Sequence, residues 1–384
     1  MTDRLGAGRR MAGLAILALA CLILVPSGVA ALETAAREAI LIDATTGAIL
    51  LEKDADAPMP PASMSKIMTA YMVFQRLKDG RLSLDDRLPV SEKAWRKGGS
   101  KMFVDLGDEI RVEDLLRGMI VQSGNDACIV LAEGLSGTEE AFAEEMTELG
   151  RKIGLTGSTF TNATGWPGPN HRTTARDLAT LARQTITNFP EYYHYYGERE
   201  FTWNDIRQGN RNPLLYKSIG ADGLKTGHTE EAGYGLTASA AQGDQRLILV
   251  VSGLDSVRAR SEEAVRLMSW GFREFGNYAL FKAGETVDEA PVWLGNLPTV
   301  PLVAKEDLIV TLTRKARKGM KVTVNYDSPI PAPFREGDQV ASLVITPSAG
   351  DPIRYPLYAG ASADLLGPIG RLVAGVEFLI FGSN

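Results

Sequence analysis

The spacing of apolar and polar positions predicts a region that opens with strands and continues with helices. Residues 39–51 contain two apolar runs on either side of a polar turn at 44–47, which indicates a β-hairpin. From Ser63 onward, apolar residues recur at intervals of three and four, so we predict a helix that ends at Asp79-Gly80. The same periodicity predicts four more helices, over 112–119, 126–135, 139–153 and 174–187.

Sheet-like sequence returns after these helices. Residues 233–240 and 246–252 are β-type runs around Gly243-Asp244, which predicts a second hairpin, and a helix is expected over 261–275. Strands at both ends of the region can share one sheet, with the helices inserted between them. We therefore predict an α+β domain over 32–288, with an antiparallel sheet and a helical cluster.

The sequence after residue 291 has a different character. Short β-type runs are separated by turns rich in Pro, Gly and Asp, which predicts a small all-β domain over 291–359. These runs are 308–312, 321–326, 340–346 and 355–358.

The last segment, 361–384, has a helical period in its apolar residues. They recur at steps of three and four: Leu365, Leu366, Ile369, Leu372, Val373, Val376, Leu379 and Ile380. Two interpretations stay open, a helix docked on the β domain and an amphipathic helix lying in a membrane interface.

The first thirty-one residues have the pattern of a secretory signal peptide. Arg4, Arg9 and Arg10 precede an uncharged apolar run over 11–25, and small residues follow up to Ala31. The alternative is an N-terminal membrane anchor, but the run is shorter than the roughly 18 to 20 residues that a span needs. We predict that residues 1–31 are removed on export.

Composition narrows the class of protein. Loss of residues 1–31 takes the net charge from −6 to −8, which argues against a nucleic-acid partner. Cys21 would be lost with the signal, so Cys128 remains alone and is expected to be a buried core residue. The three histidines are scattered and no H-E-x-x-H occurs, so we expect chemistry without a metal or other cofactor.

Three short motifs carry the candidate chemistry. Ser63 and Lys66 form an S-x-x-K at a helix start, where a lysine of lowered pKa can take the proton of a serine nucleophile. Ser123-Gly124-Asn125 is an S-x-N, whose hydroxyl can relay protons and whose amide can hold a substrate amide. Lys225-Thr226-Gly227 is a K-T-G, whose cation and hydroxyl can clamp a substrate carboxylate. The glycine would let the substrate backbone approach closely.

Each motif alone is common, but their order and spacing are not. Together they resemble the signature of penicillin-binding proteins and serine β-lactamases. Longer stretches are similar to the low-molecular-mass D-alanyl-D-alanine carboxypeptidases: 61–69, 122–128, 206–212, 222–234 and 269–275. The resemblance covers nearly the whole chain after the signal. It implies a β-lactamase/transpeptidase-like catalytic domain, then a small all-β domain and a C-terminal amphipathic anchor.

The resemblance also assigns roles to individual residues. It implies that Ser63 is acylated, that Lys66 activates it, and that Ser123 and Asn125 form the second motif. Lys225, Thr226 and Gly227 match the third motif.

Two further assignments follow from the resemblance. The backbone N–H groups of His228 and Ser63 would form the oxyanion hole, and Arg211 would lie near the substrate carboxylate. Familiar members often carry an arginine where this chain has Leu254. Carboxylate recognition by Arg258 or by Arg260 therefore stays open.

The family implies a periplasmic enzyme that removes the terminal D-Ala from peptidoglycan pentapeptides and is acylated by β-lactams. The tail would attach it to the outer face of the inner membrane. A D,D-endopeptidase and a class A β-lactamase are alternatives within the superfamily. The β-lactamase needs a glutamate in an E-x-x-L-N loop, and the only approximation, 200–204, lies too close to Lys225. A non-catalytic penicillin sensor or cell-wall scaffold is the alternative of another class, and the intact motifs argue against it.

Overall fold

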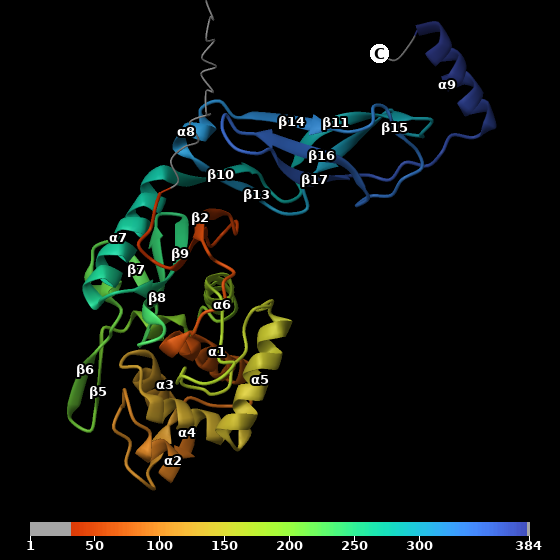
Figure 1. Cartoon of the computed structure of the whole chain (residues 1–384). Helices are drawn as coiled ribbons and strands as arrows, with labels where there is room; N and C mark the ends of the chain where they lie inside the picture. The colour runs from red at the N-terminus through yellow and green to blue at the C-terminus, as the bar shows by residue number, and fades with distance from the viewer. Residues whose placement is uncertain (1–31, 382–384) are drawn as a thin grey trace, which may run out of the picture. The chain divides into compact units, whose positions relative to one another are not determined.

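The computed structural model describes residues 32–381 (Figure 1), so the predicted signal segment, 1–31, lies outside the described residues. The chain from Thr34 onward forms one compact unit. In its first region, two strands precede the main helices and three later strands complete the same sheet, as the α+β prediction requires.

A five-stranded antiparallel sheet is the centre of the catalytic region, with strand order β2-β1-β9-β8-β7. Both predicted hairpins are confirmed, and the two ends of the region meet where Ile40 pairs with Val250. The strands are β1 (Glu38–Asp43), β2 (Ile49–Lys53), β7 (Ala221–Thr229), β8 (Gly233–Gln242) and β9 (Gln245–Leu254).

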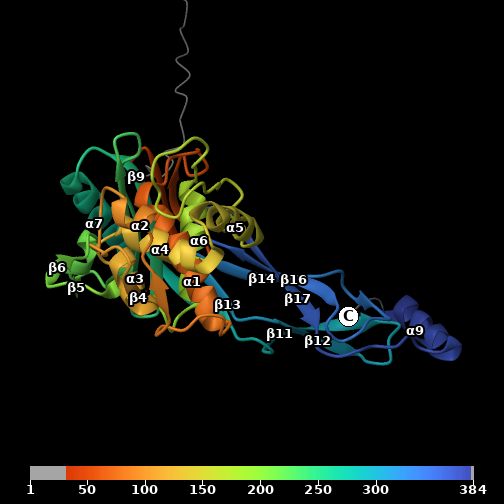
Figure 2. The ribbon, with the colours of Figure 1, turned by 90° about the horizontal axis from the view of Figure 1, so that it is seen from below.

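Helices cover both faces of this sheet, because its inner strands are apolar on both sides. Ile40 and Val250 belong to the large core shared with the helical cluster. Leu41 and Leu247 point the other way, toward Gly271 of α7 (Val257–Glu274). Figures 1 and 2 show α7 on the side of the sheet opposite to α6 (Ala175–Asn188).

The remaining predicted helices are also confirmed, within a few residues at each end. They are α1 (Lys66–Lys78), α3 (Val112–Ile120), α4 (Asn125–Ser136) and α5 (Glu139–Lys152). The first of them begins later than the sequence indicates, because a 3₁₀ turn, η1 (Ala62–Ser65), precedes it. Ser63 therefore lies on this turn, just before the α-helix.

Short elements of the catalytic region were not predicted, since they are too brief for periodicity to reveal. The pair β5–β6 turns at Asn204 and Asp205, both at positive φ, which is the geometry of a two-residue hairpin turn. These elements are β3 (Arg87–Pro89), α2 (Glu92–Arg96), β4 (Glu109–Arg111), η2 (Tyr193–Gly197), β5 (Glu200–Trp203), β6 (Ile206–Gly209) and η3 (Pro213–Tyr216).

The C-terminal region is all-β apart from two helices. A six-stranded sheet has the order β14-β16-β17-β12-β11-β15, and β10 pairs with β13 in a separate ladder. The strands are β10 (Phe275–Phe281), β11 (Thr286–Trp293), β12 (Thr299–Val303), β13 (Leu308–Thr313), β14 (Lys321–Asn325), β15 (Ile330–Pro331), β16 (Gln339–Thr346) and β17 (Ile353–Ala359), with α8 (Arg314–Arg317) after β13.

The sequence identified four of these strands and missed four. The predicted domain boundary at 288–291 falls inside β11, whose polar residues and proline hide its strand character. Because β10 pairs with β13, we propose that the β domain begins at Phe275, directly after α7.

The tail forms helix α9 (Pro368–Phe381). Its apolar residues face solvent, with Ile369 80% and Leu379 85% exposed, so the described helix is not docked through this stripe. Within residues 32–381, no helix combines the length and the apolar character that crossing a bilayer requires.

Cys128 lies on α4 and is buried in the hydrophobic core, as predicted. Its side chain is fully buried, its thiol donates to the Gly124 carbonyl at 3.1 Å, and burial raises the pKa of the thiol to about 12. Only a thiolate reacts rapidly with alkylating or disulfide reagents.

We therefore expect Cys128 to be inert in the folded protein. Titration of the protein lacking residues 1–31 with a thiol reagent at pH 8 should detect no thiol under native conditions and one in denaturant. Rapid native labelling would show that the interior around α4 opens to solvent.

Candidate active site

The 3₁₀ turn η1, which carries Ser63, packs against strand β7. At Gly227 an added Cβ would lie 3.0 Å from the Pro61 carbonyl oxygen and 3.2 Å from the Cβ of Ala62. The glycine of K-T-G is therefore needed for the packing of the strand against the turn that carries Ser63. From the sequence, Gly227 was expected instead to let the substrate backbone approach closely.

Lys66 is buried at the base of the site, with 1% of its surface exposed. Its Nζ lies 3.0 Å from Ser63 Oγ, 2.8 Å from Asn125 Oδ1 and 2.7 Å from the Thr164 carbonyl oxygen. Burial lowers the pKa of Lys66 from 10.5 to about 8, and the positive charge of Arg211 acts in the same direction.

This geometry directs the lone pair of the neutral amine. A neutral lysine has two N–H bonds, and the two pure acceptors in reach are the Asn125 amide oxygen and the Thr164 carbonyl. When both N–H bonds are used there, the lone pair is left for the hydroxyl of Ser63. The amine is thus placed to remove that proton.

The second motif fixes one wall of the site. Asn125 Nδ2 donates to the Gly98 carbonyl at 2.9 Å, and its backbone N–H donates to the Ser100 carbonyl at 2.7 Å. Ser123 is 1% exposed and adopts φ +67°, and within the described residues its hydroxyl has no hydrogen-bond partner. A buried free hydroxyl beside the nucleophile is available to substrate.

Asp126 supports the same wall, although the sequence did not single it out. Its buried carboxylate accepts hydrogen bonds at 2.9 Å from the backbone N–H groups of Met102 and Phe103. These bonds hold the segment 98–104, which contributes Gly99 and Ser100 to the cavity. In the sequence, the only local signal was that Asp126 is the single charged residue beside Asn125.

The third motif lies on β7, which is an edge strand of the sheet. Lys225 is 2% exposed, and burial together with the positive charge of Lys66 lowers its pKa well below the usual value. Among the residues that the structure describes, the only hydrogen bond of its amine is a long one, 3.4 Å, to the Thr226 carbonyl. The exposed ring of His228 stacks on Tyr234, with centroids 3.9 Å apart.

A cavity of about 430 Å³ joins the third motif to two arginines. Arg211 and Arg260 line it together with Ser63, Ser123 and Thr226. Arg211 donates to Ser100 Oγ at 2.5 Å, whereas the buried Nε of Arg260 has no hydrogen-bond partner in the part of the chain that the structure describes. Burial lowers the pKa of both guanidinium groups.

Arg258, the other arginine considered for carboxylate recognition, points away from this cavity. The side chain of Arg258 is 86% exposed and binds Glu262 on the same helix, and Leu254 is buried in β9. Of the two candidates, only Arg260 reaches the cavity.

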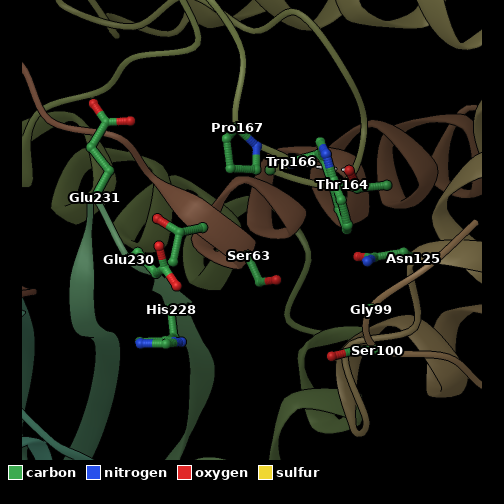
Figure 3. A pocket seen from close by; sticks show the side chains of 12 residues that line it. Ser63, Gly99, Ser100, Asn125, Thr164, Trp166, Pro167, His228, Glu230 and Glu231 are labelled. Atoms are coloured by element: carbon green, nitrogen blue, oxygen red, sulfur yellow. Dashed lines mark hydrogen bonds between the residues drawn. The ribbon is translucent and has the colours of Figure 1, made fainter.

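A second cavity, of about 690 Å³, also has Ser63 in its lining and shares Ser100 and His228 with the first (Figure 3). It is lined by Asn125, Thr164, Trp166 and Glu230, among others. In the view of Figure 3, His228 and Glu230 lie on one side of Ser63, and Asn125 lies on the other.

The loop 161–167, which was not predicted from the sequence, forms one wall of this cavity. Asn162 Oδ1 accepts hydrogen bonds from the backbone N–H groups of Thr164, Gly165 and Trp166 at 2.8–3.1 Å. Gly165 has φ +80°, and a Cβ there would lie 1.8 Å from the Ala62 carbonyl oxygen. This contact tolerates glycine alone.

His171 ties the same loop to the nucleophile turn. Its Nδ1 accepts from the Thr161 N–H at 3.0 Å, which leaves Nε2–H to donate to Ser65 Oγ at 2.8 Å. Burial lowers the pKa of His171 to about 4, so the imidazole is neutral near pH 7.

The structure thus brings the nine predicted site residues together in one site. Lys66 lies on the helix that follows Ser63, and the S-x-N motif, Arg211 and the K-T-G segment with His228 come from three other parts of the chain. Their catalytic roles stay predictions.

Comparison with known proteins identifies the family. Residues 26–256 match the D-alanyl-D-alanine carboxypeptidase family, Peptidase S11, and residues 275–364 match the C-terminal domain of penicillin-binding protein 5. The chain is 42% identical to D-alanyl-D-alanine carboxypeptidase DacC of Escherichia coli over 316 residues, which cover 80% of this chain and 79% of that protein.

Solved structures agree. Penicillin-binding protein 5 of Haemophilus influenzae superposes with a TM-score of 0.82 at 36% identity, covering 88% of this chain and all of that one. Penicillin-binding protein D2 of Listeria monocytogenes, in its ampicillin-bound form, gives 0.58 at 31% identity over 63% of this chain and 98% of that one. This chain belongs to the D-alanyl-D-alanine carboxypeptidase family.

Proposed function

We propose that the protein is a serine-type D-Ala-D-Ala carboxypeptidase, which removes the terminal D-Ala from peptidoglycan pentapeptides and is acylated by β-lactams. The observation that carries the proposal is the amine of Lys66, buried, of lowered pKa and 3.0 Å from Ser63 Oγ. The family and its named relatives supply the substrate class.

The reaction begins with acylation of Ser63. The neutral amine of Lys66 takes the hydroxyl proton, and Oγ attacks the carbonyl carbon between the two D-Ala residues. The backbone N–H groups of Ser63 and His228 stabilise the oxyanion. The C–N bond then breaks, and the proton passes from Lys66, directly or through Ser123, to the leaving amine of D-Ala. Water hydrolyses the ester and restores Ser63.

The terminal carboxylate of the substrate binds in the 430 Å³ cavity. Thr226 supplies a hydroxyl, while Arg211 and Arg260 supply guanidinium groups that match a carboxylate in shape and charge. The unpaired Nε of Arg260 is a donor that a bound carboxylate can satisfy. Lys225, the neighbour of Thr226 on β7, adds positive charge when its buried amine is protonated.

The class A β-lactamase alternative depends on a deacylating glutamate, for which Glu200 was the only approximate candidate. Glu200 lies on the β5–β6 hairpin, where its carboxylate pairs with Arg207. A D,D-endopeptidase would use the same groups, and products from a cross-linked muropeptide distinguish it.

We further propose that the protein is exported, resides in the periplasm and lies at the outer face of the inner membrane through α9. The exposed apolar residues of α9 support this placement, since a helix of this kind can bury them in the lipid interface. The net charge is negative, so apolar contact rather than attraction to anionic lipid supplies the binding.

Replacement of Ser63 tests the nucleophile. Ser63→Ala should lower the release of D-Ala from a pentapeptide ending in D-Ala-D-Ala on the order of 10⁴-fold or more, because no acyl-enzyme can form. It should also abolish covalent labelling by a fluorescent penicillin. Labelling of the variant would refute the assignment. Ser158→Ala, at a buried hydroxyl remote from the cavities, is the matched control.

The pH dependence of acylation tests Lys66 as the base. Protonation occupies its lone pair, so the second-order rate of penicillin acylation should fall as pH drops below about 8 and level off above it. Lys66→Arg, which stays charged, should be slow throughout the range. A rate independent of pH between 6 and 9 would contradict the role.

The tail is tested with vesicles of phosphatidylethanolamine and phosphatidylglycerol. Leu372→Glu with Leu379→Glu should reduce cosedimentation at least tenfold, since both exposed side chains would enter the lipid interface. Ile49→Glu, at an exposed apolar position of the catalytic sheet, should bind as the unaltered protein does. Equal binding by all three proteins would place the attachment elsewhere.

A further inference from the structure

The two cavities that meet at Ser63 differ in charge. Arg211 and Arg260 make the smaller one positive. The larger one contains no arginine or lysine among its lining residues and carries Glu230 and Glu231, in the turn between β7 and β8. Ser63 thus lines two adjoining cavities, one with two arginines and one with two glutamates.

The orientation of the substrate follows from this difference, given the proposed function on which the inference rests. The terminal carboxylate belongs in the cationic cavity, so the leaving D-Ala occupies it. Ser63 attacks the carbonyl before that residue. The rest of the peptide, on the acyl side, must then extend into the 690 Å³ cavity. The third residue from the end places its side chain there.

The lining of this cavity suits a particular kind of side chain. Trp166 presents an exposed indole (45%), and the Nζ of Lys97 lies 4.4 Å above its ring, which stabilises the ring by a cation–π contact. A long aliphatic side chain can lie along the Trp166 and Pro167 surface.

The charge available to the end of that side chain is the carboxylate of Glu230. Glu231 already binds Arg172 at 2.9 Å. Within residues 32–381, Glu230 makes no ion pair or hydrogen bond, although it borders the cavity next to His228 (Figure 3). It is therefore the one carboxylate of this lining that remains free for a ligand.

We propose that the 690 Å³ cavity is the acyl-side binding site and that Glu230 selects peptides whose third residue from the end carries a primary ammonium group. The selection acts on binding of the acyl side, and the bond cleavage at Ser63 is unchanged. Lys97, on the Trp166 side, keeps a second cation away from that wall.

The test compares two tripeptides with the same backbone. Nα-acetyl-L-lysyl-D-alanyl-D-alanine carries the ammonium group, and the Nα,Nε-diacetyl peptide lacks it. We expect kcat/KM to favour the amine by about two- to fivefold, the range of an exposed ion pair. In Glu230→Gln this ratio should fall to about one, and in Glu230→Lys below one. High salt should reduce the ratio for the unaltered protein.

Glu144→Gln, at an exposed position of α5 remote from both cavities, is the matched control and should keep the original ratio. Thermal unfolding checks that each variant is folded. An unchanged ratio in Glu230→Gln would overturn the inference and leave the carboxypeptidase proposal intact. Failure of the unaltered protein to cleave either tripeptide, or any pentapeptide, would instead overturn the proposed function.

Discussion

The contact between the amine of Lys66 and the hydroxyl of Ser63 is the constraint on which the rest of the site depends. A buried lysine costs free energy as an ion, and this cost is what makes it a base near neutral pH. The amine must also be oriented, and its two acceptors come from separate segments: Asn125 begins α4, and the Thr164 carbonyl lies in the loop 161–167. The site therefore depends on how the segments around these two acceptors are held.

Polar side chains hold the segments around these two acceptors. Asp126 binds the backbone of 102–103, and Asn162 binds the backbone of 164–166. His171, neutral because burial lowers its pKa, connects the second loop to the turn of Ser63. Backbone N–H and C=O groups inside a protein need partners, so these side chains stabilise loop conformations that contain no regular ladder.

Long runs of periodic apolar residues were enough to predict the main helices and strands. Three short motifs were enough to predict the candidate chemistry. The hairpins, the helices α1 and α3–α7 and the three motifs could all be read from it. Strands such as β11 could not, because a proline and three polar residues break the alternation that marks a half-buried strand. The loop 161–167 could not either, since its role depends on one close approach, Gly165 to the Ala62 carbonyl, between residues about a hundred positions apart.

Arg260 shows a different limit. Sequence spacing left Arg258 and Arg260 equivalent, yet residues two apart on a helix point to different sides, and only one side of α7 meets the cavity.

The same dependence on tertiary contact allows two residues with strained backbone to lie beside Ser63. Ala62 and Ser123 both adopt positive φ, and the Ser123 hydroxyl is buried without a partner. Each feature costs about 1–3 kcal/mol. A stable core of packed helices and a sheet apolar on both faces can carry that cost. In the proposed reaction, substrate would give this hydroxyl a hydrogen-bond partner that none of the described residues supplies, so part of the binding free energy would be gained next to Ser63.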